Sequence, residues 1–266
     1  MRDMKQYRVG DKFRIKDVDP DDTSLVPGGK KEGLKLNAKA AARLDVLQEL
    51  LFAERKHKVL IVLQGMDTSG KDGTIRHVMS GFDAQGVQVV SFKKPTDVEL
   101  DHDFLWRVHP HVPGRGEISI FNRSHYEDVL VVRVHDLAPK EVWKARFDQI
   151  NEFEQMLTES GTVVLKFFLH ISKDEQRKRL EERIEDPTKR WKFAHGDIEI
   201  RKYWDDYMKA YEDAMRQTST AWAPWYVVPA NAKWYRNWIV GTVLVDALEK
   251  LGSKYPKPDL SDVKVE

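Results

Sequence analysis

The sequence of 266 residues has no cysteine, no long apolar run and almost no net charge. The absence of cysteine excludes disulfide scaffolds, thiolate zinc sites and thiol nucleophiles, and it fits a reducing compartment. The longest apolar stretches, such as Val59–Leu63 and Val163–Leu169, are too short to span a bilayer. Because 44 Lys and Arg face 43 Asp and Glu, bulk positive charge cannot drive nucleic-acid binding, and any phosphate site must be a local patch.

The amino-terminal segment is charged throughout and lacks the apolar core of a signal peptide. We therefore expect a cytoplasmic protein with no membrane partner and one large domain. Turn-forming residues are frequent over 1–35, which predicts an extended arm. The main domain would cover 36–252, and 253–266, with two prolines and several charges, would be a loose tail. A homo-oligomer is compatible with the sequence, which does not define the oligomeric state.

Short apolar segments alternate with longer patterns of helical periodicity along the main domain. Continuously apolar strands separated by helices are typical of a parallel sheet covered on both faces. The expected class is therefore α/β, with a central parallel sheet in a three-layer arrangement. The predicted strands are 59–63, 87–92, 117–121, 162–170 and a weaker 225–228. The predicted helices are 36–54, 71–80, 139–160, 172–185 and 197–217.

The first apolar segment runs directly into a glycine-rich loop. Gly65, Gly70 and Lys71 satisfy the pattern Gly-x-x-x-x-Gly-Lys between a strand and a helix. In such a loop, backbone N–H groups at a helix N-terminus surround an anion and the lysine reaches the transferring phosphoryl group. We predict phosphate or nucleotide binding by Gly65, Met66, Thr68, Ser69, Gly70, Lys71, Asp72, Gly73 and Thr74.

The residue after Lys71 departs from the usual pattern. A phosphate loop normally carries a Ser or Thr hydroxyl there for Mg²⁺, but this chain has Asp72. The metal, Mg²⁺ or Mn²⁺, then needs another oxygen ligand, and Asp67 and Asp72 are the nearest carboxylates. Asp72 has a second explanation, since acidic residues are favoured in the first turn of a helix. Asp67 is therefore the stronger candidate.

Three segments together resemble the polyphosphate kinase 2 family: Gly65–Gly73, Phe121–Asp128 and Lys189–Lys192. The resemblance covers nearly the whole chain and is greatest to the class III branch, whose members phosphorylate nucleoside mono- and diphosphates. It implies a P-loop kinase fold with a helical lid at about 173–217. The implied reaction transfers phosphoryl groups between inorganic polyphosphate and nucleotides with Mg²⁺. It would convert AMP to ADP and regenerate ATP from ADP, with guanine nucleotides as further candidates.

The same resemblance implies roles for individual residues. Lys71 would be the catalytic loop lysine and Asp67 the carboxylate linked to the metal. Arg123 and Arg133 would clamp phosphate. The lid would contribute Lys189, Arg190 and Lys192.

The metal ligands of the family are altered in one place. Many members have Asp where this chain has Asn122, which removes an expected carboxylate and leaves a second metal site open. Glu127 and Asp128 are alternative replacements, and the sequence does not choose between them.

The chemistry of the residues supports a phosphate site without the resemblance. Arg123 and Tyr126 follow the predicted strand 117–121, and open α/β sheets bind ligands at the carboxyl ends of their strands. The planar guanidinium of Arg123 matches phosphate oxygens, although a surface ion pair is the alternative. Lys93 and Lys94 follow the second strand and would either hold a phosphate chain or form a solvated turn.

The predicted lid combines a helix with a basic turn. Ser172 and Glu175 have the spacing of a capping box and place the start of the helix. The stretch 189–192 after Pro187 contains no acidic residue, which favours it as the part that contacts phosphate. A lid arginine such as Arg190 would act late, on closure. Arg179 on the preceding helix is expected to be merely solvated, among many balanced charges.

We interpret the sequence as a polyphosphate-dependent nucleotide kinase. An ATP-dependent nucleoside monophosphate kinase of the thymidylate-kinase type shares the expected fold and is the alternative enzyme. A non-catalytic nucleotide or polyphosphate sensor is the alternative from another class, and the intact Lys71 argues against it.

Overall fold

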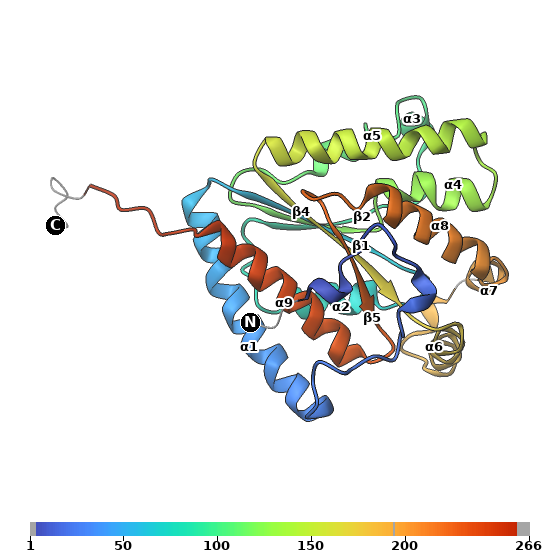
Figure 1. The fold of residues 1–266 in the computed structure, drawn as a ribbon, viewed down its shortest axis with the longest axis horizontal. Coiled ribbons are helices and arrows are strands. Elements are labelled where there is room, and N and C mark those ends of the chain that lie inside the picture. The colour runs from blue at the N-terminus through green and yellow to red at the C-terminus, as the bar shows by residue number, and fades with distance from the viewer. Residues whose placement is uncertain (1–3, 194, 260–266) are drawn as a thin grey trace.

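The structure is a computed structural model that describes residues 4–193 and 195–259. Residues 1–3 of the predicted arm and 260–266 of the predicted tail lie outside the described residues. A central sheet is covered on one side by α4, α5 and α8 and on the other by α1, α2 and α9 (Figure 1). This arrangement confirms the three-layer α/β class. No helix among the described residues is both long enough and apolar enough to cross a membrane.

The sheet of the described chain has the order β2-β3-β1-β4-β5, and all neighbouring strands are parallel. In the register, Leu63 of β1 pairs with Asn122 of β3, and Gln64 pairs with Phe168 of β4. The loops that follow these strands therefore meet at one edge. The strands agree with the predicted ones to within one residue at each end and are β1 (Lys58–Gln64), β2 (Val87–Ser91), β3 (Ile118–Asn122), β4 (Thr162–His170) and β5 (Trp225–Pro229).

Apolar residues fill both faces of the central strand. Val59 to Leu63 are almost completely inaccessible to solvent, as expected of a strand with helices on both sides. The longer helices are α1 (Gly29–Glu54), α2 (Lys71–Met79), α5 (Lys140–Glu159), α6 (Lys173–Glu185), α7 (His195–Lys202), α8 (Trp204–Thr218) and α9 (Lys233–Leu251). Two single-turn helices, α3 (Asp97–Leu100) and α4 (Val131–Val134), lie in the connections around β3.

Two helical predictions need correction, and one helix was not predicted. α1 begins at Gly29 rather than at residue 36, because Gly33 is a packing position and not a turn: a Cβ there would collide with the Trp234 ring of α9. The helix expected over 197–217 is divided at Tyr203 into α7 and α8. The sequence reasoning did not predict α9, whose apolar residues are mostly buried.

The amino-terminal arm packs against the edge of the sheet. Val9 donates a backbone hydrogen bond to Trp225 of β5 at 2.9 Å. The Tyr7 hydroxyl donates to Asp22 at 2.6 Å and lies 2.6 Å from the Tyr235 hydroxyl of α9. Tyr7, Val9 and Ile15 are buried, so this segment extends the core as well as covering it.

Candidate active site

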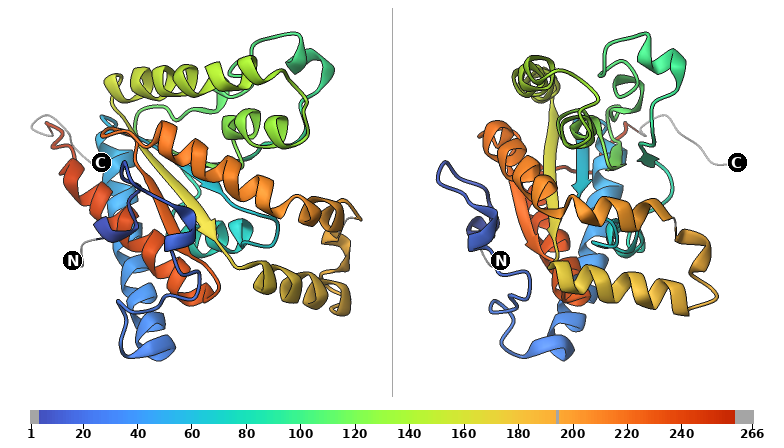
Figure 2. Two further views of the ribbon diagram at one scale, coloured as in Figure 1. Left: turned by 45° about the vertical axis from the view of Figure 1, so that its right-hand side comes forward. Right: turned by 90° about the vertical axis from the view of Figure 1, so that its right-hand side faces the viewer.

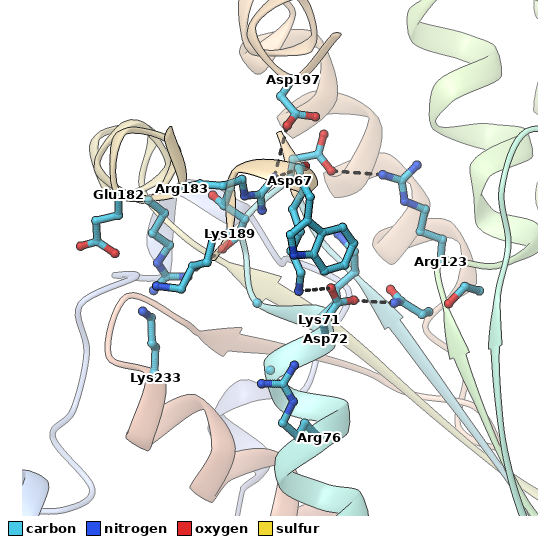
Figure 3. Close-up of a pocket in the computed structure, with 18 of the residues that line it drawn as sticks. Asp67, Lys71, Asp72, Arg76, Arg123, Glu182, Arg183, Lys189, Asp197 and Lys233 are labelled. Atoms are coloured by element: carbon cyan, nitrogen blue, oxygen red, sulfur yellow. Dashed lines mark hydrogen bonds and ion pairs between the residues drawn. The ribbon is translucent and has the colours of Figure 1, made fainter. Parts of the chain in front are cut away.

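A basic pocket of about 770 Å³ lies at the carboxyl edge of the sheet, between the glycine-rich loop and the segment around α6 and α7 (Figure 3). Eleven of its lining residues are Lys or Arg and four are Asp or Glu. The chain as a whole carries a formal charge of only +1, so positive charge is concentrated here. The pocket is a local anion site on a balanced protein.

The backbone of the glycine-rich loop is curled in a way that few residues tolerate. Gly70 has φ of 100° and precedes the first residue of α2. A side chain there would be strained, and its Cβ would collide with the guanidinium of Arg236. Thr68 also has a positive φ, 64°, a strained conformation typical of ligand-binding turns. The loop therefore has the shape of an anion cradle at a helix N-terminus.

Lys71 is folded over this loop. Its ammonium donates hydrogen bonds to the carbonyls of Gly65 at 2.7 Å and Met66 at 3.3 Å. Burial lowers the pKa of Lys71, while Asp67 beside it favours the charged form. A nearly buried ammonium beside the loop backbone can neutralise charge on a bound phosphate.

Two buried arginines donate hydrogen bonds to backbone carbonyls of the glycine-rich loop. Arg179 of α6 donates to the carbonyls of Thr68 at 2.9 Å and Ser69 at 3.2 Å, and Arg236 of α9 donates to Ser69 at 3.3 Å. Arg179 also bonds the carbonyls of Ala230 and Asn231 after β5 and pairs with Glu175 at 2.7 Å. The expectation that Arg179 is merely solvated is wrong, because the side chain is buried and joins three elements.

Arg123 lies at the side of the pocket, next to the loop. It follows β3, its N–H donates to Leu63 at 3.1 Å, and its guanidinium contacts Asp67 Oδ1 at 3.1 Å (Figure 3). Burial disfavours the charge of Arg123, but Glu127 and Asp67 outweigh it and raise the pKa. Burial also raises the pKa of Glu127, against the opposing field of Arg123 and Lys71. Acidic and basic groups are thus interleaved around the loop.

Asp72 is held by neighbours on both sides. Asn122 donates to its Oδ1 at 2.8 Å, and Lys192 lies 3.8 Å from its Oδ2. Asp67 is more enclosed than Asp72, since 18% of its side chain is exposed against 64%. Of the two candidate carboxylates, Asp67 is the one enclosed in the pocket beside Lys71.

Among the described residues, only the first part of the predicted lid, from α6 to α7, lines the pocket, whereas α8 packs against α4 and α5. Lys189, Trp191 and Lys192 line the pocket, together with Arg183, which pairs with Asp197 at 3.2 Å. Trp191 is 77% exposed. The Ser172 hydroxyl caps α6 as predicted, but Glu175 bonds Arg179 instead of completing the capping box.

Several sequence candidates do not line the pocket. Arg133 forms an ion pair with Asp213 at 2.8 Å and lies over the Trp143 ring. Tyr126 is completely buried. Arg190 donates to the carbonyls of Ile184 and Glu185 at the end of α6. Of the predicted residues in the loop and the start of α2, four do not line the pocket: Gly65, Met66, Ser69 and Thr74. The following members of the predicted set do line it: Asp67, Thr68, Gly70, Lys71, Asp72, Gly73, Lys93, Lys94, Asn122, Arg123, Lys189 and Lys192.

The sequence reasoning missed five basic residues of the pocket. They come from α2, α6 and α9, which are far apart in sequence, and single basic residues on helices give no local signal. A useful signal would have been the recurrence of Arg on α6 at a spacing of four, which puts two of them on one face. The missed residues are Arg76, Arg179, Arg183, Lys233 and Arg236.

The parallel sheet, the phosphate loop after its central strand and the ring of basic residues define a P-loop phosphotransferase. The profile of the polyphosphate kinase 2 family matches residues 29–256. The AMP/ADP-polyphosphate phosphotransferase of Meiothermus ruber is 58% identical, over 98% of this chain and 99% of that protein. The ADP-polyphosphate phosphotransferase of Rhodopseudomonas palustris is 46% identical, over 95% of this chain and 92% of that protein.

A solved structure agrees with these sequence matches. The crystal structure of polyphosphate kinase 2 from Arthrobacter aurescens TC1 superposes with a TM-score of 0.94 at 50% identity, covering 96% of this chain and 92% of that one. The chain belongs to the polyphosphate kinase 2 family and is a kinase. This confirms the resemblance carried by the three sequence motifs.

Proposed function

We propose that this protein transfers phosphoryl groups from inorganic polyphosphate to both AMP and ADP. The observation that carries the proposal is the gathering of eleven Lys and Arg around the phosphate loop of a nearly neutral chain. A polyphosphate chain presents many adjacent negative charges and needs such a surface. The relative from Meiothermus ruber is named for AMP and ADP, and the one from Rhodopseudomonas palustris for ADP.

We assign the chemical step to positioning and charge neutralisation. Lys71 would neutralise the charge that develops on the transferring phosphoryl group, and Arg123, beside the loop, would hold a phosphate. The terminal phosphate of a nucleotide is largely ionised near neutral pH, because its second pKa is about 6. Its oxygen can attack without a general base, so alignment in the pocket supplies most of the catalysis.

The carboxylates of the pocket fit a divalent cation, and we propose Mg²⁺, with Mn²⁺ as the alternative. Arg123 occupies Oδ1 of Asp67, while Oδ2 receives no hydrogen bond from the described residues. Within the same residues, no three His, Cys, Asp or Glu gather into a cluster. Mg²⁺ takes one or two carboxylates and completes its shell with phosphates and water. Asp67 would hold the ion, with Glu127 or the Asn122 carbonyl beside it, and the ion would neutralise phosphate charge.

The lid would complete the pocket. Residues from α6 to α7 line the pocket, and we propose that the turn between these helices closes on the substrates to exclude water. Lys189, Trp191 and Lys192 are the residues that would approach the substrates. Arg133 and Arg190 would reach phosphate only after a change from the contacts described above.

The acceptor range is tested by supplying polyphosphate and Mg²⁺ with either AMP or ADP and following the products by chromatography. We expect ADP to form from AMP, and ATP to form from ADP. Phosphorylation of one nucleotide alone would contradict the proposed dual acceptor range. The absence of turnover with both would favour the sensor.

A further inference from the structure

A buried ion pair lies in the core near the pocket but outside it. Lys166, in the middle of β4, and Glu154, on α5, are in contact and both side chains are completely inaccessible to solvent. Burial disfavours the charge of Glu154, but Lys166 outweighs it and holds the pKa of Glu154 below its usual value. The contact with Lys166 therefore favours the ionised form of the glutamate within the protein core.

The pair is saturated by a small network of hydrogen bonds. Besides Glu154, Lys166 donates to the Tyr126 hydroxyl at 2.9 Å and the Thr218 carbonyl at 2.7 Å. The Tyr126 hydroxyl lies 2.8 Å from Glu154, to which it donates, and 3.0 Å from the Thr218 hydroxyl. His125 lies 3.4 Å from the same carboxylate. Every ammonium proton of Lys166 has a partner, as a buried charge requires.

The network includes residues that are close in sequence to Arg123, which lines the pocket. His125 and Tyr126 lie between Arg123 and Glu127 in sequence, in the turn that follows β3. Thr218 is the last residue of α8, the helix whose Tyr207 and Tyr211 are influenced by the charges of Glu127 and Asp67. The network therefore joins β4 and α5 to the segment that carries Arg123.

The backbone of Arg123 has a strained conformation that the surrounding structure must stabilise. Its φ of 63° is in the left-handed region, which is costly for a residue with a long side chain. Such strain persists where the surrounding structure fixes the neighbouring residues, and it is concentrated at functional sites. Tyr126, three residues later and completely buried, provides a fixed point of this kind.

Stability alone does not explain the ion pair. Replacing a buried ion pair by apolar residues of similar volume is often neutral or stabilising. The apolar core around β4 could accommodate such residues. A network of buried hydrogen bonds does restrict the orientation of its members, which apolar packing does less strictly.

We propose that the Lys166–Glu154 pair, acting through the Tyr126 hydroxyl, is a positioning device that holds Arg123 against the phosphate loop. Lys166, Glu154 and Tyr126 do not touch the substrates in this account. They fix the turn after β3, and the turn fixes the guanidinium that faces Asp67. The inference rests on the proposed function, because its readout is phosphoryl transfer.

The test is a double-mutant cycle on turnover with ADP, polyphosphate and Mg²⁺. Tyr126→Phe keeps the buried ring and removes the hydroxyl that joins the turn to the ion pair. We expect it to lower kcat about tenfold or more, because small misplacements of a catalytic group are costly. In an Arg123→Ala background, the same change should alter kcat less than about twofold, since coupled residues are not additive.

The matched control is Tyr7→Phe, which removes another buried hydroxyl with two polar partners, Asp22 and Tyr235. It should lower the melting temperature and leave kcat unchanged. Equal losses of kcat in both Arg123 backgrounds, or an unchanged kcat in Tyr126→Phe, would overturn the positioning role. Either result would leave the proposed function intact, because that is decided by the turnover of the unsubstituted protein.

Discussion

The phosphate loop and the tip of the lid are both basic, but they are held in different ways. Ser69 and Lys71 of the loop are buried, and the loop carbonyls accept hydrogen bonds from α6 and α9. At the tip, Arg190 and Trp191 bond carbonyls three to six residues earlier in the chain, and both are exposed. The loop is shaped by distant elements, whereas the tip is shaped mainly by its own turn.

The two regions meet at few places in the described chain. Lys192 of the tip lies 3.8 Å from Asp72 of α2. Two views show α6 and α7 projecting from the body of the molecule beyond β4 (Figure 2). The loop is fixed by hydrogen bonds from distant helices, whereas the tip has few such contacts. We therefore expect substitutions to reduce activity most at the loop and least at the tip.

Lys71→Ala should have the largest effect. The ammonium is the loop's own positive charge, and its loss removes stabilisation of the transferring phosphoryl group. We expect kcat to fall by about a hundred- to thousandfold. The melting temperature should change little, which differential scanning fluorimetry checks alongside the rate. A near-normal rate would remove the loop from the mechanism.

Arg179→Ala should affect both stability and rate. It removes a buried donor from four backbone carbonyls of the loop and the β5–α9 connection, of which the Ser69 carbonyl keeps the bond from Arg236. We expect unfolding in urea to become easier by about 3 kcal/mol and kcat to fall about tenfold. Arg177→Ala is the matched control, because Arg177 lies on the same helix, is exposed and pairs only loosely with Glu181 at 3.6 Å. It should change stability by less than about 0.5 kcal/mol, and equal effects of the two variants would contradict the support assigned to Arg179.

Asp67→Asn should weaken the metal dependence. The amide keeps the size of the side chain but loses the charge that favours Mg²⁺. We expect the Mg²⁺ concentration for half-maximal rate to rise about tenfold, measured by titration at saturating nucleotide. Asp72→Asn should shift it less, because both oxygens of Asp72 already face donors from the chain. The opposite order would make Asp72 the metal ligand.

Arg190→Ala should have the smallest effect. Its guanidinium is exposed and donates hydrogen bonds to carbonyls at the carboxyl end of α6. Exposed charged contacts of this kind contribute up to about 1 kcal/mol to the free energy of the interaction. The rate should therefore fall less than about fivefold. A hundredfold loss of kcat with unchanged nucleotide affinity would contradict this and show that the tip rearranges so that Arg190 reaches the phosphates, the role that the sequence pattern suggests.

The same contrast explains what the sequence could predict. The strands and the loop are encoded by neighbouring residues, an apolar run followed by spaced glycines and Lys71, so their positions were correct. Arg179 and Arg236 reach the loop from α6 and α9 only after folding, so their sequence surroundings gave no sign of it. The start of α1 was misplaced for the same reason, because the Trp234 ring that requires a glycine at position 33 lies on a distant helix.

The most direct test of the account is the choice of phosphoryl donor. Wild-type protein and AMP are incubated with Mg²⁺ and either polyphosphate or ATP, and the initial rate of ADP formation from AMP is measured with each donor. A pocket that binds a long polyanion predicts rapid phosphorylation of AMP when polyphosphate is the only phosphoryl donor, without ATP or another triphosphate. Phosphorylation of AMP with ATP but not with polyphosphate would contradict the account and identify an ATP-dependent nucleoside monophosphate kinase.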